Sequence, residues 1–147
     1  GEACHYFDLT SFLCNSPIVE VYMQSLGLNA GLDTDHASII LRMQNGSSAV
    51  INYFTNGAKD YPKERIEVHQ LNRTAVIDNF KRIDYYGFKK RSNSSVQDKG
   101  HSAQFKTWLN FISNGGSAPI PFESFWNTSY ASIMAIESFK ENKPISF

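Results

Sequence analysis

The chain has 147 residues, of which 14 are Lys or Arg and 14 are Asp or Glu, so its formal net charge is zero. This balance argues against a protein that binds nucleic acid by neutralising phosphates. Apolar residues make up 41% of the chain and aromatic residues 14%, shares that a disordered chain would not carry. No apolar run is long enough to span a membrane, so we expect residues 1–147 to form a single globular domain.

The first half of the chain predicts one helix and then strands. Pro17 ends the helical pattern because it disfavours helix in the residue before it. Alternation of apolar and polar side chains after Pro17 is typical of half-buried strands. Asn45-Gly46 indicates a hairpin, because a type I′ turn needs positive φ at both central residues. The elements predicted here are a helix over 3–15 and strands over 18–26, 36–44 and 48–55, with a loop over 27–35.

The second half continues with strands and ends in two helices. The predicted strands cover 64–70, 74–80 and 83–89, a polar loop covers 91–100, and the helices cover 102–113 and 123–141. The first of these helices has the spacing of a stripe that faces a core, at Phe105, Trp108, Leu109 and Ile112. In the second helix, helical spacing is kept by Trp126, Tyr130, Ile133 and Phe139.

Strands joined by short turns and followed by helices predict an α+β fold. We expect a mostly antiparallel open sheet of about six strands with the helices packed on one face. The other face is open to three interpretations, which are water, a second domain or a second copy of the chain.

Several kinds of site are excluded by spacing. Cys4 and Cys14 would lie about 15 Å apart along one helix, too far for a disulfide, so we expect two reduced thiols in a cytoplasmic protein. No two histidines have H-x-x-x-H spacing, which argues against a metal site. No G-x-G-x-x-G follows a predicted strand, so this chain should not bind a dinucleotide by itself.

Two short stretches carry side chains suited to chemistry. His5 and Asp8 are neighbours on a helix, and a carboxylate beside an imidazole fixes its tautomer, as a general acid or base needs. Lys99 and His101 open a helix, where they could meet an anionic or hydroxyl-rich ligand. Lys63 lies in a stiff, charged entry to a strand. For each of these residues the alternative is a solvated surface side chain.

Four short motifs follow one another along nearly the whole chain. They are G-E-A-C-H-Y-F-D-L at 1–9, Y-P-K-E-R-I-E-V-H at 61–69 with T-A-V-I-D-N-F at 74–80, D-K-G-H at 98–101, and P-I-P-F-E at 119–123. In this order they resemble the C-terminal domain of the Gfo/Idh/MocA oxidoreductases, the family of glucose–fructose oxidoreductase and inositol dehydrogenase. They look most like a subgroup in which this module belongs to larger two-part bacterial dehydrogenases.

The resemblance implies that an N-terminal Rossmann domain of the same protein binds NAD or NADP, with no cofactor held by this chain. It implies that this domain supplies an open sheet, part of a pocket for a small polyol or sugar, and the interface of a homo-oligomer. By position, His5 is the family histidine that helps remove the hydroxyl proton while hydride goes to the nicotinamide. Asp8 matches an acidic residue that orients the histidine, and Lys63, Lys99 and His101 match the substrate pocket.

The chain departs from the family pattern in two ways. The Rossmann domain and its E-K-P lysine motif are absent, so we expect a piece of a longer protein that is inactive alone. Many members have Asp four residues before the histidine, where this chain has Gly1, so the proton relay would be organised differently, with Glu2 as a candidate. Two other hypotheses stay open: a non-catalytic module that dimerises through its sheet, and a small-molecule binding domain of unrelated ancestry.

Overall fold

The computed structural model describes residues 2–27, 31, 34–89 and 98–147. The predicted loops over 27–35 and 91–100 therefore lie largely outside the described residues, as does Gly1. The chain divides into two compact units, Gly1–Asn56 with Ile120–Phe147, and Gly57–Pro119. The predicted α+β class with antiparallel strands is confirmed, and the described strands form one sheet of four and another of three.

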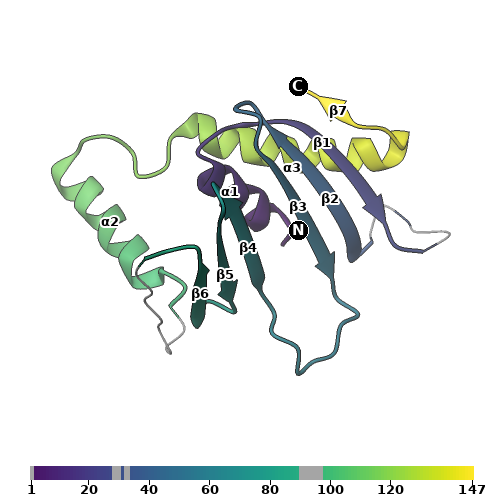
Figure 1. Ribbon diagram of the computed structural model, residues 1–147. Helices are drawn as coiled ribbons and strands as arrows, with labels where there is room; N and C mark the ends of the chain where they lie inside the picture. Colours follow the sequence, from purple (N-terminus) through teal and green to yellow (C-terminus); the bar gives the residue numbers. More distant parts are fainter. Residues whose placement is uncertain (1, 28–30, 32–33, 90–97) are drawn as a thin grey trace. The chain divides into compact units, whose positions relative to one another are not determined.

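The first unit consists of a four-stranded sheet and two helices on one of its faces (Figure 1). Its antiparallel strands lie in the order β3-β2-β1-β7. The two-residue strand β7 is too short to show an alternating pattern in the sequence. The elements are α1 (Cys4–Cys14), β1 (Ile18–Ser25), β2 (His36–Met43), β3 (Ser48–Phe54), α3 (Phe122–Glu141) and β7 (Ile145–Ser146).

The inner face of this sheet forms the hydrophobic core. Alternation along β2 buries every second side chain, Ala37, Ile39, Leu41 and Met43. From α3 the buried side chains are small ones, Thr128, Ala131, Ala135 and Ser138. Trp126 and Ile133, by contrast, are more than half exposed. Helical spacing alone does not separate the two apolar faces of α3, and the face with small side chains is the one that packs on the sheet.

Side chains of α3 also complete the edge of β1. The Asn127 amide accepts a hydrogen bond from the Ile18 N–H and donates one to the Ile18 carbonyl, both at 2.9 Å. The Ser138 hydroxyl accepts one from the Met23 N–H at 3.2 Å. These contacts satisfy backbone groups of β1 that the short strand β7 does not reach.

The second unit contains a three-stranded antiparallel sheet in the order β4-β5-β6. Both of its turns, Leu71-Asn72 and Asn79-Phe80, have positive φ at both central residues, as in a type I′ turn. The strand predicted over 83–89 ends earlier, at Tyr86, and Gly87 follows it with φ of +76°. A Cβ added to Gly87 would lie 2.6 Å from the Asn72 carbonyl oxygen. The elements are β4 (Arg65–Gln70), β5 (Arg73–Asp78), β6 (Arg82–Tyr86) and α2 (His101–Asn114).

The apolar stripe of α2 does not face a core. None of the residues of α2 is buried, and Phe105, Leu109 and Ile112 are 70%, 62% and 71% exposed. The prediction of a core-facing stripe is therefore wrong for the described part of this unit. The spacing shows that one face of the helix is apolar, but it does not identify what that face packs against.

Two further features bear on the sequence predictions. Cys4 and Cys14 are free thiols on α1, as the spacing predicted. Among the helices that the structure describes, none combines the length and the apolar run that crossing a bilayer requires.

Candidate functional site

The first predicted site lies on α1. His5 and Asp8 are one helical turn apart, and both side chains are exposed. Within the described ranges no hydrogen bond or ion pair joins them, although the sequence predicted that Asp8 orients the ring. The helix therefore brings both groups to the surface on neighbouring positions.

A tyrosine that the sequence analysis missed adjoins the start of α1. The Tyr53 hydroxyl donates a hydrogen bond to Glu2 Oε2 at 3.2 Å, and the Glu2 carbonyl accepts one from the His5 N–H at 3.2 Å. Burial raises the pKa of Tyr53, and the negative charge of Glu2 raises it further, so the phenol stays a hydrogen-bond donor. Alternation in β3, which puts Tyr53 on the same face as buried Ile51, was the signal available in the sequence.

The other predicted residues belong to the second unit. The Lys99 ammonium lies 3.2 Å from Glu64 Oε1, in a pair whose side chains are 39% and 8% exposed. Lys63 precedes this glutamate and is exposed, and His101 is the exposed first residue of α2. Glu64 was missed because its partner lies 35 residues away in the sequence. The charge of Lys99 is therefore already paired with the carboxylate of Glu64.

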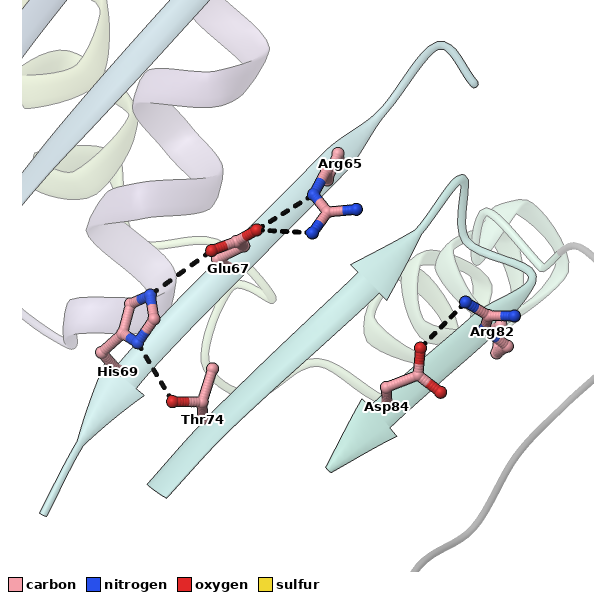
Figure 2. A network of polar contacts seen from close by, with 6 residues as sticks. All are labelled: Arg65, Glu67, His69, Thr74, Arg82 and Asp84. Atoms are coloured by element: carbon pink, nitrogen blue, oxygen red, sulfur yellow. Dashed lines mark hydrogen bonds and ion pairs between the residues drawn. The ribbon is translucent and has the colours of Figure 1, made fainter. Parts of the chain in front are cut away.

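A surface network covers one face of the three-stranded sheet. Figure 2 shows its side chains on all three strands: Arg65, Glu67, His69, Thr74, Arg82 and Asp84. The Arg65 guanidinium, 2.8 Å from Glu67, holds the pKa of that carboxyl below its usual value. His69 lies 3.6 Å from Glu67 and 3.1 Å from the Thr74 hydroxyl. Exposed pairs of this kind contribute little stability, and we assign no ligand to them.

The described strands do not have the arrangement of a Rossmann unit. The strand pairs described above are antiparallel, whereas a Rossmann unit needs parallel strands and a glycine-rich turn into a helix. Nor do the described residues include a group of three His, Cys, Asp or Glu side chains that could hold a metal ion.

Solved structures share the fold of the chain at low sequence identity. The WlbA dehydrogenase from Bordetella pertussis, in complex with NADH and UDP-GlcNAcA, matches with a TM-score of 0.74 and 20% identity, over 100% of this chain and 44% of its own. The UDP-N-acetylglucosamine 3-dehydrogenase GnnA from Acidithiobacillus ferrooxidans matches with 0.76 and 16%, over 94% and 45%. An oxidoreductase from Agrobacterium radiobacter, in complex with NAD+, L-tartaric acid and magnesium, matches with 0.81 and 17%, over 99% and 48%.

The chain thus spans less than half the length of these three proteins. No curated protein sequence matches it. The family model described as the GFO/IDH/MocA C-terminal domain matches residues 2–75, which is half of the chain and includes α1 and the first sheet strands. The resemblance drawn from the sequence motifs is confirmed, and the chain belongs to the family of Gfo/Idh/MocA C-terminal domains.

Proposed function

We propose that this chain is the substrate-binding and oligomerisation domain of an NAD- or NADP-dependent oxidoreductase of the cytoplasm. The substrate would be a sugar, a cyclitol or a related hydroxyl compound. The family match over residues 2–75 carries the proposal, because it includes α1 with His5 and Asp8. The nicotinamide-bound complexes of WlbA and of the Agrobacterium oxidoreductase, each about twice as long as this chain, support a Rossmann domain as its partner.

In this proposal the residues of α1 handle the proton of the substrate. His5 removes it from the hydroxyl that is oxidised, and its exposure leaves the ring open to a substrate. Asp8, one turn further along the helix, adds negative charge near the imidazole and orients it. Lys63, Lys99 and His101 are the further residues that the family resemblance assigns to substrate binding.

The proposal is tested with the full-length protein that contains this chain and its Rossmann domain. We expect it to reduce NAD or NADP when offered a panel of sugars and cyclitols, and we expect the chain alone to bind neither cofactor in a calorimetric titration. Tight binding of NAD by the chain alone would contradict the assignment. A full-length protein that dimerises but oxidises nothing in the panel would favour the non-catalytic module instead.

The outer face of the four-stranded sheet is proposed as the oligomer interface. Ile40 and Val50 are opposite each other on β2 and β3 and are 49% and 63% exposed, and Phe54 is 44% exposed. Beside this apolar patch, Arg42 and Glu20 form a two-pronged ion pair at 3.1 Å. An apolar centre with a polar rim is the usual composition of an interface between subunits.

Val50→Arg should dissociate the oligomer, because a second copy would then bury an unpaired charge in the apolar patch. We expect the dissociation constant to rise about a hundredfold, measured by analytical ultracentrifugation. Leu71→Arg is the matched control, since Leu71 is an exposed apolar residue of the other unit and is 83% exposed. If both variants keep the parental mass, the outer face of the sheet is not the interface.

A further inference from the structure

Glu64 is the one ionisable side chain among the buried residues of the described ranges. It is 8% exposed, and its Oε1 atom accepts a hydrogen bond from the Lys99 ammonium at 3.2 Å. Its Oε2 atom is shielded from solvent and has no hydrogen-bond partner among the described residues. Buried polar atoms are nearly always paired, so this carboxylate depends on the Lys99 ammonium, its one side-chain partner in the described ranges.

The backbone around this pair holds it in place. The Glu64 carbonyl accepts a hydrogen bond from the Asn79 N–H at 2.7 Å, and the Asp98 N–H donates one to the Phe80 carbonyl at 3.3 Å. The Lys99 ammonium also lies 5.9 Å from the centre of the Phe80 ring. The contacts with Glu64 and with the Phe80 ring therefore hold the Lys99 side chain in place, just before the start of α2.

The pair offers hydrogen bonds without net charge. A lysine ammonium has three N–H donors, and one of those of Lys99 points to Glu64. The Lys99 side chain is 39% exposed, so a ligand can approach it from solvent. The adjoining start of α2 would favour an anion, and the negative charge of Glu64 offsets this preference. A neutral hydroxyl group can accept a hydrogen bond from the remaining donors of Lys99 and needs no net positive charge to do so.

We propose that Glu64 is a specificity-determining residue, which cancels the charge of Lys99 so that this place accepts hydroxyl groups and discriminates against phosphate or carboxylate groups. The inference rests on the proposed function, in which Lys99 and His101 bind the substrate. It adds that the part of the substrate at Lys99 is an uncharged polyol segment.

The test measures the binding of inorganic phosphate to the full-length protein by calorimetry. In Glu64→Gln the Lys99 charge is no longer cancelled, so phosphate should bind about fivefold tighter, the upper range for a partly exposed ion pair. The KM for the neutral substrate should rise by a similar factor with a smaller change in kcat. Glu67→Gln is the control, because it removes the same charge from an exposed pair a little further along the chain, on β4, and should leave both values as in the parent.

A second variant tests whether the freed cation is the cause. The double variant Glu64→Gln with Lys99→Gln should lose the tighter phosphate binding. A folded Glu64→Gln protein that binds phosphate as the parent does would overturn the inference. If Glu64→Gln does not fold, Lys99→Gln replaces it and should weaken phosphate binding, so that unchanged binding overturns the inference.

The phosphate titration does not depend on catalysis. A protein that oxidises no sugar or cyclitol, and whose Glu64→Gln variant still gains phosphate affinity, contradicts the proposed function but supports the role of Glu64. An active enzyme whose Glu64→Gln variant gains none contradicts only the role of Glu64.

Discussion

His5→Ala should lower the turnover of the full-length oxidoreductase by about 10²–10⁴-fold, the usual contribution of a general base. A hydroxyl group that is oxidised must give up its proton, and histidine is the side chain most often placed to accept it. The affinity for NAD or NADP should stay nearly unchanged, because we assign cofactor binding to the Rossmann domain. Steady-state kinetics and a cofactor titration on the same samples measure both quantities.

The controls separate catalysis from folding. His69→Ala makes the same chemical change at a histidine whose side chain is 65% exposed and lies outside the proposed site, so its turnover should equal that of the parent. Asp8→Asn should reduce turnover less than His5→Ala, because it keeps the base and removes only a charge beside it. If His5 serves only to pack the chain, His5→Ala will lower the melting temperature while the folded enzyme keeps normal turnover, and the assignment is then wrong.

The strands of the first sheet were predictable because burial on one face imposes a strict alternation. In β2 every second side chain is apolar and buried. The strand predicted over 36–44 therefore agrees with the observed His36–Met43 except for one residue at its end.

The Asn45-Gly46 signal placed the hairpin between β2 and β3 correctly, but the predicted type I′ turn was wrong. Of these two residues only Gly46 has positive φ, and the turn hydrogen bond runs from the Gly46 N–H to the Met43 carbonyl. Ile39 therefore lies opposite Ile51, whereas a two-residue turn at Asn45-Gly46 would place it opposite Asn52.

The helices were located correctly, but spacing did not identify which of their faces are buried. On α3 the large apolar side chains form a stripe that includes Trp126 and Ile133, whereas the sheet contacts the small side chains Ala131 and Ala135. Small side chains allow a helix to approach a sheet closely, and this preference depends on the shape of the sheet surface rather than on spacing. On α2 the stripe is apolar but exposed, and a sequence pattern carries no information about the partner of such a face.

The site could be predicted only in part, for a related reason. His5 and Asp8 were found because they lie within one short motif. The pairs of Tyr53 with Glu2 and of Glu64 with Lys99 join residues 51 and 35 positions apart, so the folded chain alone reveals them. Glu64 stands between the charged residues Lys63 and Arg65 before β4, and such a charged stretch gives no sign in the sequence that one of its side chains will be buried.

Leu41→Ala should lower the free energy of unfolding of the first unit by about 2–5 kcal/mol. Leu41 is 0% exposed on the central strand β2, where it lies opposite Val21 on one side and Ala49 on the other. Its removal loses the transfer free energy of the buried side chain and leaves a cavity that the rigid sheet and α3 cannot fill. Denaturant unfolding, followed by a signal from this domain in the full-length protein, measures the loss.

Ile40→Ala is the matched control, one residue earlier on the same strand. Its side chain points to the outer face and is 49% exposed, so alanine there should change the free energy of unfolding by less than about 1 kcal/mol. Measuring at a protein concentration where the oligomer is dissociated keeps any interface contribution of Ile40 out of the comparison. Because the two residues differ mainly in the face they occupy, the difference between the variants reports the burial of that face. Equal losses would mean that both faces of the sheet are covered within one copy of the protein, and the outer face could then not serve as the subunit interface.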